Sequence, residues 1–237
     1  ISGKTVTAEF AVHKLNETLN PHDLKLTPGT SSSGSAVSVA TGVCPVALGS
    51  QTAGSIVRPA SFTGVYGFKP SYGLVPRTGM LKTTDTLDSI GFFTIHYKDL
   101  LRVFEAVRVK GKNYPLSNGP LTDIKRQNKD KSKPWRVAFI KTYTWNDAED
   151  YAKQKIEKYV NELSNLNDLE IDELKLPGVF ERIHELHSII YKKALSYYFS
   201  KEYKTFDQMS DIMTDLIEQG LKISPTDYND AINKQLL

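Results

Sequence analysis

The sequence predicts an α/β protein in which helices cover a mixed β-sheet, and three observations support this fold class. The chain has 237 residues, of which 40% are hydrophobic and 24% charged, an ordinary globular composition with enough chain for a sizeable core. Short apolar runs typical of strands are followed by longer segments of helical periodicity. The two kinds of segment also alternate along the chain, which is typical of helices layered on a sheet.

The first part of the chain, residues 1–107, is rich in Gly, Ser, Thr and Pro between short apolar runs. Small residues over 35–42 predict a tightly packed helix that Gly42 ends. Residues 46–49 and 64–68 are apolar on both faces and predict buried strands. Apolar residues at helical spacing predict a helix over 99–107.

The rest of the chain differs from the first part in amino-acid composition and in the spacing of its apolar residues. Residues 108–133 hold several prolines and glycines among many charges, which predicts a polar connection. From residue 134 onward Lys, Glu, Tyr and Leu recur at helical spacing. This region predicts strands over 135–140 and 169–176, and helices over 147–163, 179–203 and 207–220, the last capped by Gly220. We assign 1–237 to a single domain, with a core at 1–107, the connection at 108–133 and the remaining elements at 134–237.

Composition argues against several classes of protein. The 30 basic residues nearly balance 27 acidic ones and are dispersed, which does not indicate direct nucleic-acid binding. No apolar run is long enough to span a membrane. One cysteine, Cys44, excludes an internal disulfide, and no metal-binding motif occurs, so we expect a cytoplasmic protein without metal or cofactor. Because the chain starts at Ile1 without a signal-peptide pattern, we expect it to be an internal piece of a longer protein.

Two hydroxyl-rich loops, Gly29-Thr-Ser-Ser-Ser-Gly34 and Gly49-Ser-Gln-Thr-Ala-Gly-Ser55, are the best candidates for chemistry. Such loops expose backbone N–H groups, which anions and oxyanions require. A phosphate-binding P-loop would need a lysine where Ser35 stands. A nucleophile elbow would need glycines two residues either side of the serine, but Ala53 and Val57 flank Ser55.

Histidine offers no clear partner for these serines. A Ser-His-Asp triad assembles in space, so distance along the chain does not exclude it. None of the five histidines lies in either loop, and we interpret His184 and His187 as ordinary residues of a predicted helix. A serine activated by lysine is the remaining variant of nucleophilic catalysis.

Four segments in order make that variant specific: Pro28-Gly-Thr-Ser-Ser-Ser-Gly-Ser35, Gly49-Ser-Gln-Thr-Ala-Gly-Ser55, Arg58-Pro59 and Gly64-Val-Tyr-Gly-Phe-Lys-Pro70. Together they resemble the signature of the amidase-signature family, and the resemblance extends from residue 3 to about residue 107. It implies the mixed-sheet fold of that family, of which this chain would hold part.

The resemblance implies a role for each matching residue. Ser55 matches the nucleophile, and Ser31, 24 residues earlier, matches a bridging serine that follows a cis peptide bond. The backbone N–H groups of the oxyanion hole match Thr52, Ala53, Gly54 and Ser55. Substrate contacts are expected from Thr30, Ser32 and Thr52.

The family's catalytic lysine belongs to a segment upstream of Ile1. Lys4 and Lys69 match other segments of the signature, and Lys69 is expected to be structural. The resemblance therefore implies that Ser55 would pass its proton through Ser31 to a lysine outside this chain, attack an amide carbon and form an acyl-enzyme that water hydrolyses.

Three functions follow from this interpretation. The first is an amidase that hydrolyses the C–N bond of a small-molecule amide, with a homodimer as one expected arrangement. The alternative is the glutaminase (A) subunit of a tRNA-dependent amidotransferase complex, and the third is a fold that has lost catalysis. Gln51 stands where such subunits mostly carry Asp, and Val57 where they carry Arg, which favours the stand-alone amidase.

Overall fold

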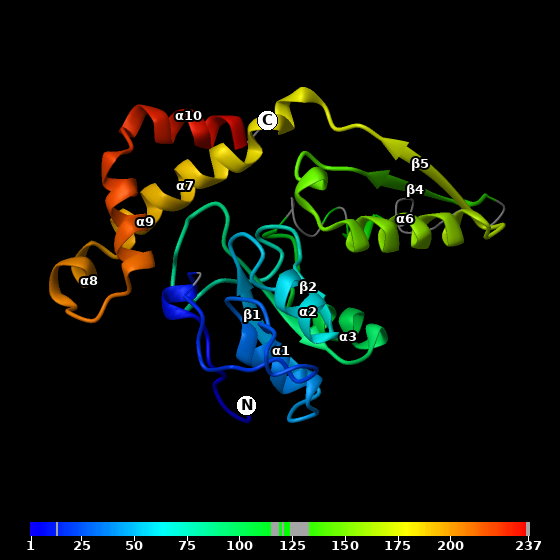
Figure 1. Ribbon diagram of the computed structural model, residues 1–237, viewed down its shortest axis with the longest axis horizontal. Coiled ribbons are helices and arrows are strands. Elements are labelled where there is room, and N and C mark those ends of the chain that lie inside the picture. Colours follow the sequence, from blue (N-terminus) through cyan, green and yellow to red (C-terminus); the bar gives the residue numbers. More distant parts are fainter. Residues whose placement is uncertain (13, 115–118, 120, 124–132, 236–237) are drawn as a thin grey trace. The chain divides into compact units, whose positions relative to one another are not determined.

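The computed structural model describes residues 1–12, 14–114, 119, 121–123 and 133–235, which fall in two compact units (Figure 1). The first unit comprises residues 1–119 and 186–237, and the second comprises residues 120–185. Residues 186–237, which we grouped with the second part of the chain, thus belong to the first unit. Much of the predicted polar connection lies outside the described residues, and the single-domain assignment stays a prediction.

An antiparallel sheet with strand order β1-β3-β2 forms the centre of the first unit. Its strands are β1 (Val46–Gln51), β2 (Tyr66–Phe68) and β3 (Ser89–Thr94). In the register, Gln51 of β1 faces Ser89, and Phe68 of β2 faces Phe92. Gly91 allows this close pairing, because a Cβ there would lie 2.1 Å from the carbonyl oxygen of Phe68.

The sequence did not predict β3, although it is the buried strand. Phe92 and Phe93 are fully buried, whereas Leu48 in β1 is 59% exposed. Residues 46–49 and 64–68 lie in or overlap strands as predicted, but the prediction that these strands are buried is wrong. Within the described residues, β1 and β2 are the outer strands of this sheet. An outer strand pairs on one side only, so its apolar side chains are less enclosed.

Three helices pack near this sheet: α1 (Ser33–Ala40), α2 (Val57–Thr63) and α3 (Tyr97–Val107) (Figure 1). A core cluster joins α1 and α2 to β3 through Ala36, Val39, Ile56, Ala60 and Phe93. The predicted stop of α1 is confirmed, since Gly42 follows it in the left-handed region at φ 75°. The short helix α2 was not predicted, and its proline lies in the first turn, where a helix tolerates it.

The remaining helices of the first unit are α7 (Ile183–Tyr198, which enters the unit at Leu186), α8 (Ser200–Thr205), α9 (Asp211–Lys222) and α10 (Pro225–Gln235). The predicted helix over 179–203 is interrupted: residues 178–182 form a 3-10 turn, and Phe199 separates α7 from α8. Serine caps α9, since Ser210 Oγ accepts a hydrogen bond from the N–H of Met213 at 3.3 Å.

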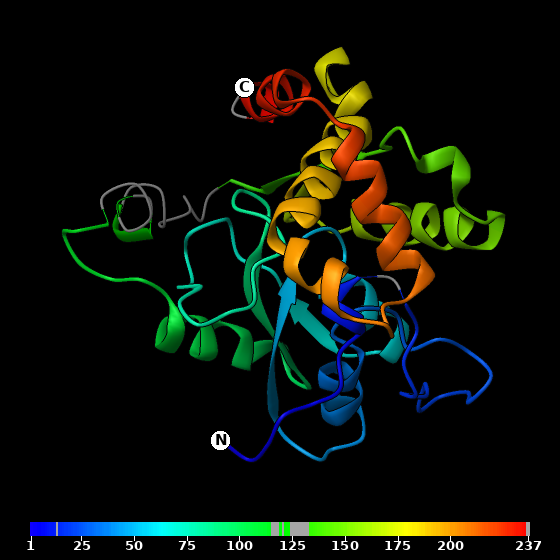
Figure 2. The same cartoon turned by 90° about the vertical axis from the view of Figure 1, so that its left-hand side faces the viewer.

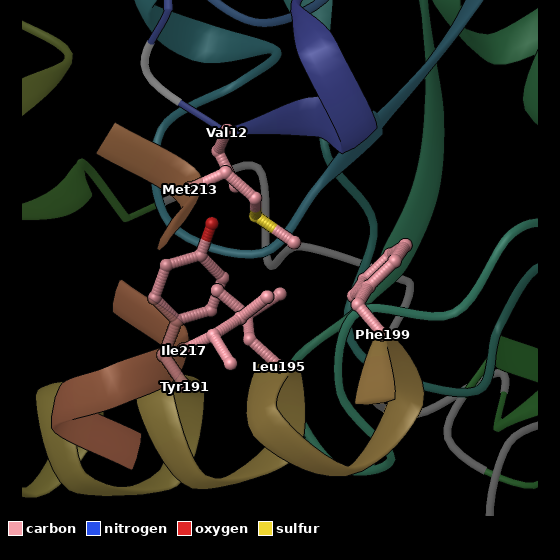
Figure 3. Close-up of a cluster of buried hydrophobic side chains, with 6 residues drawn as sticks. All are labelled: Val12, Tyr191, Leu195, Phe199, Met213 and Ile217. Atoms are coloured by element: carbon pink, nitrogen blue, oxygen red, sulfur yellow. The ribbon is translucent and has the colours of Figure 1, made fainter. Parts of the chain in front are cut away.

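A second core cluster ties the N-terminal segment to these helices. Val12, just after the 3-10 helix η1 (Glu9–Ala11), packs with side chains of α7, the α7–α8 junction and α9 (Figure 3). These partners are Tyr191, Leu195, Phe199, Met213 and Ile217. Figure 2 shows the N-terminal segment beside α8 and α9 from the side.

Gly220 does not cap a helix, contrary to the prediction. It lies inside α9 and is buried, and a Cβ there would lie 2.0 Å from the carbonyl oxygen of Lys192 in α7. The glycine therefore lets two helices cross closely, a requirement that comes from packing and not from helix termination.

The second unit contains a parallel pair of strands with a helix between them in the sequence. β4 (Trp135–Ile140) and β5 (Leu169–Leu174) pair in register from Trp135 with Leu169, and α6 (Asp150–Ser164) connects them. The predicted strands and helix of this region are confirmed, with ends shifted by up to three residues. Among the helices of the described residues, none has the length and apolar character needed to cross a membrane.

Candidate active site

The two hydroxyl-rich loops lie against each other in the first unit. The N–H of Ser32 donates to the carbonyl oxygen of Ser55 at 3.3 Å. Ser32 Oγ also donates to the carbonyl oxygen of Ser50 at 3.2 Å and accepts from the N–H of Ser50 at 3.3 Å. Ser32, expected to contact substrate, therefore joins the loop before α1 to the end of β1. The fold thus brings the backbones of the Ser31 and Ser55 segments together.

Ser31 has a fixed backbone and an unpaired hydroxyl. The peptide bond between Thr30 and Ser31 is cis, as the resemblance implied. The Ser31 carbonyl oxygen accepts from the N–H of Ala8 and from Thr7 Oγ1, each at 3.1 Å. Ser31 is 1% exposed, and its Oγ has no hydrogen-bond partner among the described residues, a property shared there only with Glu9 Oε2. Such a buried hydroxyl is suited to receive a partner during a reaction.

Arg58 holds the residue before Ser31. Its Nε and Nη2 donate to the Thr30 carbonyl oxygen at 3.2 and 2.9 Å, and Nη2 also donates to Thr30 Oγ1 at 2.9 Å. Burial lowers the pKa of the Arg58 guanidinium from its ordinary value. Thr30, expected to contact substrate, is buried, and its side chain is bound to Arg58. Gly29 completes this turn at φ 77°, where a Cβ would lie 2.9 Å from the Cα of Pro59.

Gln51 organises the loop that carries Ser55. Its Oε1 accepts from the N–H groups of Ile56 and Val57 at 2.8 and 3.0 Å, and its Nε2 donates to the Ala53 carbonyl oxygen at 2.8 Å. An ionised aspartate could accept the first two hydrogen bonds but could not donate the third. The amide at position 51 is therefore physically matched to this loop.

Three backbone carbonyl groups of the loop accept hydrogen bonds from other groups of the protein. The carbonyl oxygen of Ala53 accepts from Gln51, that of Gly54 from the N–H of Arg58 at 2.9 Å, and that of Ser55 from Ser32. In a trans peptide the N–H points opposite to the C=O, so the N–H groups of Gly54 and Ser55 point away from Gln51 and α2. Across the described part of the chain, the N–H groups of Ala53, Gly54 and Ser55 donate no hydrogen bond. The loop therefore presents unpaired donors next to Ser55.

Thr52 is held by a buried carboxylate that the sequence interpretation missed. Thr52 Oγ1 donates to Asp88 Oδ1 at 2.7 Å, and Asp88 is 1% exposed. The same carboxylate accepts from the N–H groups of Thr83 and Thr84 at 2.8 and 3.0 Å and from both of their hydroxyls. The hydroxyl of Thr52, expected to contact substrate, is thus committed to Asp88. Asp88 lies in Leu87-Asp-Ser-Ile-Gly91, inside the range of residues 3–107 over which the chain resembles the amidase-signature family, so the sequence did contain a signal for it.

A cavity of about 260 Å³ lies beside Ser55. It is lined by Ala11, Thr52, Ala53, Ser55, His187, Ser188, Tyr191, Lys192 and Leu216. Burial raises the pKa of the Tyr191 hydroxyl well above its ordinary value. His187 Nε2 lies 3.2 Å from the carbonyl oxygen of Thr52. His187, which we interpreted as an ordinary residue of a predicted helix, does lie in α7 and contacts the loop that carries Ser55. The sequence offered no signal for this contact beyond the helical spacing of His187 and Tyr191.

No metal centre is formed by the described residues, since none of their His, Cys, Asp and Glu side chains gather in groups of three or more suited to an ion. Lys69, expected to be structural, donates to the Pro70 carbonyl oxygen at 2.7 Å, and burial lowers its pKa from the ordinary value. Neither Lys69 nor Lys4 is bound to Ser31 Oγ.

Comparison with known proteins gives a consistent result. The Amidase family model matches residues 1–235. The chain is 33% identical over 244 residues to the A subunit of the glutamyl-tRNA(Gln) amidotransferase of Heliobacterium modesticaldum, a match that covers 99% of this chain and 50% of that relative. It is 38% identical over 181 residues to the corresponding protein of Staphylococcus epidermidis strain RP62A, covering 75% of this chain and 36% of that relative. The chain thus spans about half the length of the first of these relatives and less of the second.

A solved structure described as a crystal structure of an amidase has a TM-score of 0.77 and 25% identity to this chain. The match covers 92% of this chain and 46% of that structure's chain. A 6-aminohexanoate cyclic dimer hydrolase complexed with substrate also has a TM-score of 0.77, at 18% identity, covering 98% of this chain and 50% of its own; at that identity the likeness concerns the fold alone.

Proposed function

The chain belongs to the amidase family, and on this premise we propose that it hydrolyses the C–N bond of a carboxylic amide through an acyl-enzyme on Ser55. The observation that carries the proposal is the loop of unpaired N–H groups at Ala53, Gly54 and Ser55, beside a cavity that Ser55 itself lines. Donors preorganised in this way stabilise the oxyanion of acyl transfer.

The proposed reaction begins with proton transfer. The Ser55 hydroxyl gives its proton to Ser31 Oγ, whose own proton passes to a neutral lysine contributed from outside residues 1–237. The unpaired Ser31 hydroxyl supports this bridging role, because a relay needs one acceptor and one donor position that the fold has not already used. Ser55 Oγ then forms a bond to the amide carbon, and the carbonyl oxygen takes the negative charge.

Collapse of this intermediate completes acylation. The C–N bond breaks, the amine leaves with the proton returned through Ser31, and water later hydrolyses the ester by the same sequence. Each N–H of the loop that binds the oxyanion would lower the barrier by about 3–4 kcal/mol. Gly54 fits this role, because the nearest atom to a Cβ at that position would be Arg58 Cβ at 3.7 Å, an ordinary contact. Internal packing does not demand glycine there, whereas close approach of a substrate carbonyl would.

A second candidate function is favoured by the relatives. Both curated relatives described above are A subunits of glutamyl-tRNA(Gln) amidotransferases, which makes a glutaminase subunit of such a complex a concrete alternative. Gln51 and Val57 depart from what we expect of those subunits, and the hydrogen bonds of the Gln51 side chain support an amide at position 51. We therefore retain the stand-alone amidase as the first candidate.

The decisive experiment labels the natural full-length chain with a fluorophosphonate probe and locates the adduct by mass spectrometry. We expect the adduct on Ser55, loss of labelling and of amide hydrolysis in Ser55→Ala, and neither loss in Ser61→Ala, which replaces an exposed serine of α2. Unlabelled Ser55 together with full activity in Ser55→Ala would refute the mechanism.

Ammonia release should then be compared for glutamine and for a neutral aryl amide. Hydrolysis of the aryl amide by the protein alone supports the amidase. Hydrolysis of glutamine only, and only with partner subunits present, would favour the alternative.

A further inference from the structure

His187 contacts the loop that carries the nucleophile, although it lies 135 residues away from Thr52 in the sequence. Its Nε2 is 3.2 Å from the carbonyl oxygen of Thr52. A carbonyl oxygen can only accept, so Nε2 carries a hydrogen and donates it. The ring also stacks on Tyr191, with ring centroids 5.9 Å apart and an interplanar angle of 29°. Tyr191 belongs to the buried cluster between α7 and α9, so the imidazole is supported from the core.

This hydrogen bond determines the direction of a peptide plane. The Thr52 carbonyl points to His187, and the N–H of Ala53 belongs to the same trans peptide, so that N–H points the opposite way. The N–H of Ala53 has no acceptor among the described residues. Thr52 is held at a second point, since its hydroxyl donates to Asp88. The Asp88 bond fixes the position of Thr52, while the His187 bond fixes the rotation of the Thr52–Ala53 peptide.

We infer that His187 is a positioning residue, which holds the N–H of Ala53 in the direction needed to bind the oxyanion. The inference rests on the proposed function of Ser55. Nε2 itself cannot accept the Ser55 proton, because it already donates to Thr52. His187 thus acts on the reaction through the backbone of its neighbour.

The test replaces His187 with two amide side chains, those of Gln and Asn, which differ in length by one methylene group. In the natural full-length protein, His187→Gln places an N–H donor at about the same distance along the side chain as Nε2, whereas His187→Asn carries the same group one carbon short of Thr52. His184→Gln is the control, because His184 is an exposed histidine of the same helix and does not line the cavity. The readouts are kcat, KM and the rate of fluorophosphonate labelling, with thermal unfolding measured for every variant.

We expect His187→Asn to lower kcat by about 10- to 100-fold, somewhat less than deletion of an oxyanion donor, with KM changed much less. His187→Gln should recover most of that loss, and His184→Gln should match the unmodified protein. If both substitutions at 187 are equally harmful, or if neither changes kcat, the inference is overturned. An unlabelled Ser55 in the unmodified protein would instead overturn the proposed function, so the two failures are distinguishable.

Discussion

Replacement of Asp88 tests whether one buried carboxylate holds the start of the Ser55 loop. Its Oδ2 accepts from the N–H groups of Thr83 and Thr84, and its Oδ1 accepts from the hydroxyls of Thr52, Thr83 and Thr84. Thr83 and Thr84 are 3% and 0% exposed, so water cannot readily replace a lost acceptor. Asp88→Ala and Asp88→Asn remove different parts of this arrangement.

The expected magnitudes follow from the number of donors that lose their acceptor. Asp88→Ala leaves two buried backbone N–H groups unpaired, and each costs about 1–3 kcal/mol, so the free energy of unfolding should fall by about 2–6 kcal/mol. The hydroxyls can rotate toward other partners and are not counted. In Asp88→Asn, the amide oxygen can still accept from both N–H groups while the hydroxyls turn to accept from the amide nitrogen. Loss of charge assistance should then cost only about 1–3 kcal/mol.

Urea unfolding should be followed by far-UV circular dichroism, with hydrogen exchange to locate the loosened segment. Tryptophan fluorescence is the wrong probe, because Trp135 and Trp145 both lie in the second unit. Asp99→Ala is the control: its carboxylate pairs with the exposed Arg102 at 3.1 Å, and such a surface pair contributes about 0–1 kcal/mol. An Asp88→Ala variant that loses no more stability than this control, or less than Asp88→Asn, would refute the reasoning.

Two further predictions concern Arg58 and Asp85. Arg58→Lys cannot make all three hydrogen bonds to Thr30 at once, so the free energy of unfolding should fall by about 1.5–3 kcal/mol in urea titrations, and an unchanged midpoint would contradict this. The Tyr198 hydroxyl, hydrogen-bonded at 2.5 Å, lowers the pKa of Asp85 below its ordinary value of 3.8. Because the folded-state pKa is the lower one, the ionised carboxylate stabilises the fold above that ordinary value, and this contribution is lost as pH falls through the folded-state pKa. The stability difference between the unmodified protein and Asp85→Asn, measured at pH 7 and pH 3, should therefore shrink at pH 3; an equal difference at both values would contradict the assignment.

Local patterns were sufficient for much of the secondary structure. The helices α3 and α6 follow from apolar spacing, α1 follows from a run of small residues, and the strands β1, β4 and β5 follow from short apolar or alternating runs. All of these patterns depend only on residues a few positions apart. The prediction failed where a residue serves a distant contact. Gly220 was predicted to cap a helix, but in the structure it lies inside α9 and allows that helix to approach Lys192 of α7 closely.

For the candidate site too, some features could be predicted from local sequence and others depend on the tertiary structure. The order and spacing of the serine and glycine residues by themselves indicate the family and identify Ser31 and Ser55 as candidates, because these loops are contiguous in sequence. Only the tertiary structure brings Asp88 to the hydroxyl of Thr52 and His187 to its carbonyl. The physical reason is that a hydrogen bond depends on distance in space, and a separation of 135 residues is closed by the packing of α7 and by no local pattern.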